Sequence, residues 1–222
     1  MLKKLNLNDL LSGCKLYGEE TDYDKSYIDF LNTINHSLDL RNRGHIKALY
    51  DWLKSWGCIH FMDNYCSKFS DDIYIWYKKY EKFLPYKDKK LLDFNSADYS
   101  AICLVYEFLS NIKVSHSKSL GPTCTAKTLF AFRPDFFIPW DNDIRKEFHC
   151  GNSAFHYIKY LNFIKDILYE IENQCKKNGF SLIELPVKIG RPFSTPTKLI
   201  DEYFWITITK DKTPQKINIF LV

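Results

Sequence analysis

Apolar residues recur at helical spacing along most of the chain, and this periodicity constrains the fold more than any other feature of the sequence. It is clearest between residues 153 and 177, where apolar side chains follow one another at intervals of three and four and charged side chains take the opposite face. The apolar face comprises Tyr157, Ile158, Leu161, Ile164, Ile167, Leu168, Ile171 and Cys175. Such a stripe is typical of an amphipathic helix that packs one face against a core.

Four earlier segments show related patterns. Residues 23–38 and 43–56 each carry an apolar stripe, and residues 70–84 form a third candidate helix that a proline ends. Residues 97–112 are almost entirely apolar, which predicts a helix buried on most of its faces. We therefore expect a mainly α fold in which residues 1–222 form a single globular unit of two helical lobes that share a cleft.

The periodicity changes near the C-terminus. Residues 204–210 alternate in character and contain β-branched side chains, residues 211–215 are typical of a turn, and residues 216–222 alternate again before becoming apolar. Alternation with a period of two indicates half-buried strands. The sequence therefore predicts a small β-hairpin over 203–222.

Several classes of protein are excluded or disfavoured by composition. No run of the roughly 18–20 apolar residues needed to span a membrane is present, and the first residues lack the sustained apolar region of a signal peptide. The seven cysteines are an odd number without a Cys-x-x-Cys pair, which a reducing compartment tolerates, and they lack the paired spacing of a structural zinc site. We expect a cytoplasmic protein with no membrane partner, no metal and no other cofactor.

Positive charge is concentrated although the formal net charge is only +4. Neither Asp nor Glu occurs between residues 107 and 135 or between residues 184 and 201. The cations of these two windows are Lys113, Lys118, Lys127, Arg133, Lys188, Arg191 and Lys198. A face of this kind suits phosphate groups, although gaps of this length also arise by chance in a chain with 26% charged residues.

The first window contains a distinctive order of motifs. A tight turn, Leu120-Gly121-Pro122, opens a short helix rich in Thr and Ala, and a proline ends that helix. The segment Ile138-Pro-Trp-Asp141 follows, and another helix with an early arginine starts near Asp141. This order, over about 30 residues, resembles the core of the helix-hairpin-helix DNA glycosylases, the endonuclease-III-like superfamily.

The resemblance assigns roles to individual residues. Gly121 matches the second glycine of the hairpin, whose backbone N–H groups hold a DNA phosphate in that family. Asp141, twenty residues later, matches the catalytic aspartate at the mouth of the base pocket, and Arg145 matches the arginine of the next helix. Ser119 replaces the first hairpin glycine, and Thr123 stands where bifunctional members carry the lysine that forms a Schiff base.

The resemblance implies a DNA-binding protein that hydrolyses the N-glycosidic bond of a modified or damaged base without lyase activity. It implies double-stranded DNA as a partner and no iron–sulfur cluster, because the four-cysteine pattern is missing. The DNA-binding candidates are Lys118, Ser119, Gly121, Thr123, Lys127, Arg133, Arg145, Lys188 and Arg191. Phe136, Phe137 and Trp140 are the candidates for a base pocket, since aromatic rings stack on extruded bases.

Each of these assignments has a structural alternative. Asp141 can act simply as a helix N-cap, a position that aspartate favours. The aromatic residues, 17% of the chain, can be core side chains. Two other functions therefore stay open: a non-catalytic DNA-binding module of the same fold, and a helical protein that binds another protein or a small molecule.

Overall fold

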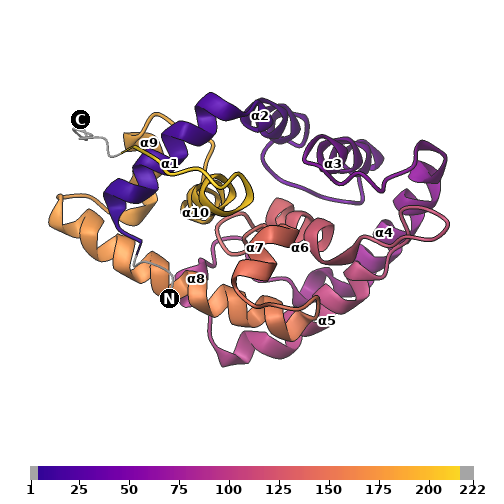
Figure 1. Ribbon diagram of the computed structural model, residues 1–222. Helices are drawn as coiled ribbons and strands as arrows, with labels where there is room; N and C mark the ends of the chain where they lie inside the picture. The colour runs from indigo at the N-terminus through magenta and orange to yellow at the C-terminus, as the bar shows by residue number, and fades with distance from the viewer. Residues whose placement is uncertain (1–4, 216–222) are drawn as a thin grey trace.

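The computed structural model describes residues 5–215 and is mainly helical (Figure 1). Its α-helices are α1 (Leu7–Glu20), α2 (Tyr23–Thr33), α3 (Arg43–Ser55), α4 (Cys66–Tyr80), α5 (Tyr99–Ser110), α6 (Gly121–Phe132), α7 (Asn142–Glu147), α8 (Ala154–Lys177), α9 (Leu185–Lys188) and α10 (Pro196–Phe204). Within the described residues, β structure is limited to one antiparallel bridge between Lys113 and Ser119. The prediction of a mainly α fold is confirmed.

Helix α8 follows the apolar stripe almost residue for residue. It begins after Ser153, whose backbone is extended, and it ends at Lys177; Asn178 is the C-cap and precedes Gly179, which has a φ of +81°. A glycine just beyond a helix accepts this left-handed conformation without the strain that a Cβ atom would add. Although α8 has 24 residues, its outer face is charged, and no helix in residues 5–215 is long and apolar enough to cross a membrane.

Helix α6 is the most enclosed of the longer helices. From Cys124 to Phe132 every residue except Lys127 is buried, whereas α5 leaves Glu107 and Phe108 exposed. Figure 1 shows α6, α7 and α10 in the middle of the view, between α1, α2 and α3 on one side and α5 and α8 on the other. Buried residues from Leu5 to Phe204 form one connected hydrophobic core. The division of the helices into two lobes stays a prediction.

The predicted first strand of the C-terminal hairpin is wrong. Helix α10 continues into a π-helical segment, η6 (Trp205–Thr209), in which the Thr207 hydroxyl donates to the Tyr203 carbonyl at 2.8 Å. Ile206 is fully buried and Phe204 nearly so, which anchors the helical path against the core. The predicted second strand, 216–222, lies outside the described residues. The alternating pattern of residues 204–210 is thus compatible with a helical path, because Phe204 and Ile206 pack against the core in α10 and η6.

Candidate functional site

A cavity of about 680 Å³ lies where α6, α7 and α10 approach the segment that follows α3. Eight of the residues singled out in the sequence line it. They are Lys118, Ser119, Gly121, Thr123, Lys127, Trp140, Asp141 and Arg145. The first acid-free window and the Pro-Trp-Asp segment therefore meet in space, as the sequence resemblance requires of a single site.

The cavity does not include the other five candidates. Arg133 lies half-buried, with its Nε donating to the Pro85 carbonyl at 2.5 Å. Phe136 and Phe137 are fully buried in the core and form no wall of the cavity, so the sequence-based expectation that they stack on a base is wrong. Lys188 lies over the Phe180 ring, and Arg191 belongs to a separate ion network, so neither reaches the cavity.

Gly121 begins α6 at the edge of the cavity with a φ of +64°. This left-handed conformation favours glycine, because a Cβ atom would be strained there. Leu120 occupies the N-cap position, and no side chain at that position caps the helix. The first N–H groups of an α-helix have no partner within the helix and carry the positive end of its dipole, so this end of α6 offers donors to an anion.

Asp141 is both a helix cap and a cavity residue. One carboxylate oxygen, Oδ1, accepts a hydrogen bond from the Ile144 N–H at 2.8 Å at the start of α7. The other oxygen, Oδ2, accepts from the Thr209 hydroxyl at 2.5 Å. The N-cap interpretation is confirmed, and the half-buried carboxylate still borders the cavity.

Arg145 brings a positive charge into this wall without a neutralising carboxylate. Its guanidinium is buried and donates to the Thr123 hydroxyl at 2.7 Å and to the Asn142 side-chain oxygen at 3.2 Å, while it lies over the Trp140 ring. No carboxylate within residues 5–215 forms an ion pair with it. Burial lowers its pKa, and the nearby Asp141 and Asp143 carboxylates, which form no ion pair with it, only partly oppose this shift.

Asp201 is a cavity residue that sequence reasoning missed. It lies on α10, half-buried, and no group in the described chain forms an ion pair or hydrogen bond with its carboxyl. Burial raises its pKa to about 8; Lys127 opposes this shift and Asp141 adds to it. The signal available in the sequence was the pair Asp201-Glu202 directly after Leu199-Ile200, where a short amphipathic helix turns acidic groups inward.

An aromatic wall, also missed, closes one side of the cavity. Its rings are those of Tyr23, Trp56 and Trp205, with Tyr23 and Trp205 at 5.7 Å between centroids and Tyr23 and Trp56 at 6.4 Å. These residues come from α2, the end of α3 and the start of η6, so only the fold brings them together. Trp140 borders the cavity too, but it is fully buried, and its indole N–H donates to the Pro122 carbonyl at 3.1 Å, which holds the start of α6.

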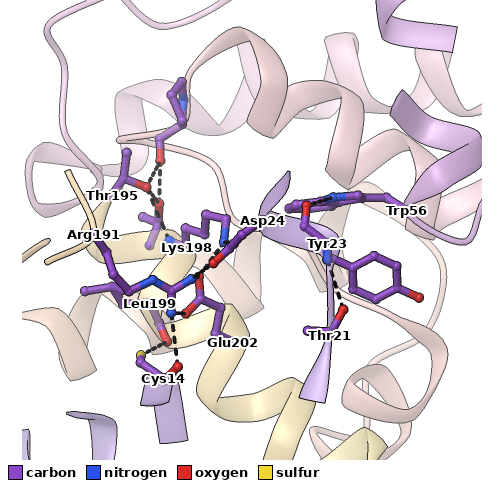
Figure 2. A network of polar contacts seen from close by, with 12 residues as sticks. Cys14, Thr21, Tyr23, Asp24, Trp56, Arg191, Thr195, Lys198, Leu199 and Glu202 are labelled. Atoms are coloured by element: carbon purple, nitrogen blue, oxygen red, sulfur yellow. Dashed lines mark hydrogen bonds and ion pairs between the residues drawn. The ribbon is translucent and has the colours of Figure 1, made fainter. Parts of the chain in front are cut away.

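Beside the cavity, a closed network of buried charges holds α10 in place (Figure 2). Lys198 and Arg191 both form ion pairs with Asp24 of α2 and with Glu202 of α10. Two positive and two negative charges cancel, and Lys198 and Glu202 are almost completely buried. Two of the three cations of the second acid-free window, Arg191 and Lys198, therefore belong to this network and are not free to form a basic face.

The chain has no significant match among protein-family models, curated proteins or solved structures. The function of the site is therefore argued from its geometry. No group of three or more His, Cys, Asp or Glu side chains that could hold a metal ion occurs in residues 5–215.

Proposed function

We propose that this chain binds double-stranded DNA and that its main cavity receives a base turned out of the duplex, as in the helix-hairpin-helix N-glycosylases that residues 119–148 resemble. One observation carries the proposal. Gly121 at the start of α6, Asp141 at the start of α7 and the buried Arg145 border one cavity. These are the three residues that the sequence resemblance singled out for DNA binding and catalysis. Enzymes that act on a base must take it out of the stack into such a pocket.

The part of the cavity formed by α6 and Arg145 supports phosphate binding. A buried guanidinium without a carboxylate partner is costly unless a ligand balances it. The uncapped start of α6 adds backbone donors, and the exposed Lys118 adds charge at the rim. The loop between α5 and α6, closed by the bridge between Lys113 and Ser119, joins the two helices by a backbone hairpin and is consistent with the resemblance.

The aromatic wall supports binding of a base. Stacking on an aromatic ring contributes about 1–3 kcal/mol per base and tolerates any base, since each has a π face. Tyr23 and Trp205 are half-buried and supply such faces, whereas Trp56 is buried and stacks on Phe130. About 680 Å³ is ample for one nucleotide. In this proposal the aromatic wall stacks on the base, a role that we expected from the sequence for Phe136 and Phe137.

The two carboxyl groups suit hydrolysis of an N-glycosidic bond. A water oxygen forms a bond to the sugar C1′ as the bond from C1′ to the base nitrogen breaks. The side chain of Asp141 can stabilise the positive charge that develops on the sugar and orient the water, whose proton passes to solvent. Asp201, which burial keeps largely protonated at neutral pH, can donate its proton to the departing base. Thr123, in place of a lysine, favours hydrolysis without lyase chemistry.

A non-catalytic DNA-binding module of the same fold is the second candidate. The observation that favours it is the engagement of both Asp141 oxygens, one by the Ile144 N–H and one by the Thr209 hydroxyl. A catalytic role needs the Thr209 hydroxyl to move away or to share that oxygen.

The test measures base release from duplexes that each carry one of many damaged or modified bases, with the wild type, with Asp141→Asn and with Asp51→Asn. Asparagine also caps helices well, so Asp141→Asn removes the charge and keeps the fold. Asp51, an exposed carboxylate paired with Lys47 on α3, is the matched control. We expect release by the wild type and by Asp51→Asn, and none by Asp141→Asn.

The other outcomes separate the candidates. Salt-dependent duplex binding without release from any substrate would favour the non-catalytic module. Release that survives Asp141→Asn would show that another residue carries the reaction. A lack of both release and binding would contradict the proposal and favour a helical protein that binds another protein or a small molecule.

A further inference from the structure

Another cavity, of about 600 Å³, lies between α8 and the continuous segment of α10 and η6. Its floor is apolar and is formed by Leu5, Phe163, Ile167, Tyr203, Phe204 and Ile208. Phe163 and Tyr203 are half-buried, so part of each ring stays accessible from the cavity. A hollow of this volume with an apolar floor is typical of a site for one small organic ligand.

Carboxylates form the rim of this second cavity. Glu147 comes from the end of α7, Asp166 and Glu170 from α8, and Asp211 from the residues that follow η6. No lysine, arginine or histidine of residues 5–215 lines the cavity. Glu147, Asp166 and Asp211 are exposed, and none of the three forms an ion pair within the described chain. Three negative charges at the rim are therefore left for a ligand to balance.

The turn after η6 holds Asp211 at the rim. Its φ is +50°, and the following Lys212 N–H donates to the Ile206 carbonyl at 3.0 Å. Aspartate is one of the few residues other than glycine that adopt this left-handed conformation readily. The backbone that carries this carboxylate is thus already in place before a ligand binds.

The distribution of the carboxylates decides which kind of cation fits. In residues 5–215 no three His, Cys, Asp or Glu side chains form a group that could hold a metal ion. Carboxylates from three separate elements suit several positive charges that an apolar chain joins. Ammonium groups can then approach the rim while methylene groups lie on the floor, as the stems of lysine side chains lie on apolar surface. An ammonium above an aromatic face gains further electrostatic energy.

We propose that the second cavity binds a linear aliphatic polyamine, with its ammonium groups at the rim carboxylates and its methylene groups on the apolar floor. The negative rim selects for positive charge, and the floor distinguishes an alkyl chain from a compact cation. The proposal does not depend on DNA binding, because the second cavity and the main cavity have no lining residue in common.

The test is isothermal titration calorimetry on the full-length protein, free of DNA, with spermidine and with hexaamminecobalt(III). The two cations carry the same charge near neutral pH, but only spermidine has methylene groups to bury. We expect spermidine to bind at one site, with an affinity that falls as salt is added. We expect hexaamminecobalt(III) to bind at least about tenfold more weakly, because it gains nothing from the apolar floor.

Two combined variants locate the binding site. The rim variant carries Glu147→Gln, Asp166→Asn and Asp211→Asn. The control variant changes the net charge equally at exposed carboxylates that do not line the cavity, namely Glu19→Gln, Asp51→Asn and Asp88→Asn. We expect the rim variant to bind spermidine about tenfold more weakly or worse, and the control variant to stay within about twofold of the wild type. Circular dichroism checks that both variants are folded.

Four results would overturn the proposal. They are the absence of spermidine binding to the wild type, equal affinity for the two cations, equal losses in the rim and control variants, and unchanged affinity in a folded rim variant. A lysine-rich peptide is titrated in parallel. If the peptide binds and free spermidine does not, the occupant of the cavity is a basic segment of a partner protein and the polyamine proposal is wrong.

Discussion

Arg145 and Arg191 are both largely enclosed arginines, yet their surroundings balance their charge in different ways. Arg191 forms ion pairs with Asp24 and Glu202, and these carboxylates raise its pKa against the opposing effect of burial. Arg145 has a hydroxyl and an amide oxygen as partners, and burial lowers its pKa. A buried charge that is paired within the chain belongs to the fold, whereas one left unbalanced at a cavity calls for a ligand.

The same contrast holds for the two neighbouring acids on α10. Glu202 is completely buried and pairs with Lys198 and Arg191. Asp201, one residue earlier, faces the cavity without an ion pair. Burial raises the pKa of both groups, and it raises that of Asp201 to about 8. One turn of helix thus supplies a structural anchor and a group suited to proton transfer.

Among these substitutions, we expect Glu202→Gln, which breaks the closed network, to lower the free energy of unfolding most. It leaves Lys198 and Arg191 buried with Asp24 as their one remaining carboxylate partner, and removal of one partner of a buried ion pair costs about 3–5 kcal/mol. Urea unfolding followed by circular dichroism measures the loss. Glu19→Gln, on an exposed pair with Lys15, is the control and changes the free energy of unfolding by less than about 1 kcal/mol. Equal losses in the free energy of unfolding for the two substitutions would contradict the stabilising role of the buried network.

Asp201 predicts a pH dependence of stability with a definite sign. In the unfolded chain its carboxyl ionises near pH 4, whereas in the folded protein it keeps its proton until about pH 8. Between these values the folded state binds more protons, so its contribution makes the protein less stable as pH rises, by at most about 1.4 kcal/mol per pH unit. Urea midpoints measured across this range should fall more steeply for the wild type than for Asp201→Asn. Parallel curves would contradict the assignment.

Arg145→Met should have a much smaller effect on the free energy of unfolding than Glu202→Gln. Replacing an unbalanced buried charge by an apolar side chain of similar length removes two hydrogen bonds and also removes the cost of burying the charge. We expect the free energy of unfolding to change by less than about 1 kcal/mol in the absence of ligand. A loss as large as that of Glu202→Gln would show that Arg145 serves the fold.

The helices were predictable from local pattern, because apolar spacing reflects which face meets the core. The helical path of residues 204–210 was not predictable in this way, because their alternating pattern suits a strand. Phe204 and Ile206 are buried against helices that are distant in the sequence, and this burial favours the helical path. The site was partly predictable. Gly121, Asp141 and Arg145 lie close in the sequence, whereas the aromatic wall and the pairing of Arg191 with Asp24 join segments that only folding brings together.

Whether Arg145 binds DNA is decided by the affinity for a labelled DNA duplex, measured by fluorescence anisotropy over a series of salt concentrations. We expect wild-type binding to weaken with salt, and we expect Arg145→Met to lower the slope of log K against log salt by about one, with a loss of about 1.5–3 kcal/mol in binding free energy. Arg43→Met, which removes an exposed arginine paired with Asp71, should leave binding nearly unchanged. Equal affinity of wild type and Arg145→Met, or no binding by the wild type at low salt, would contradict the claim.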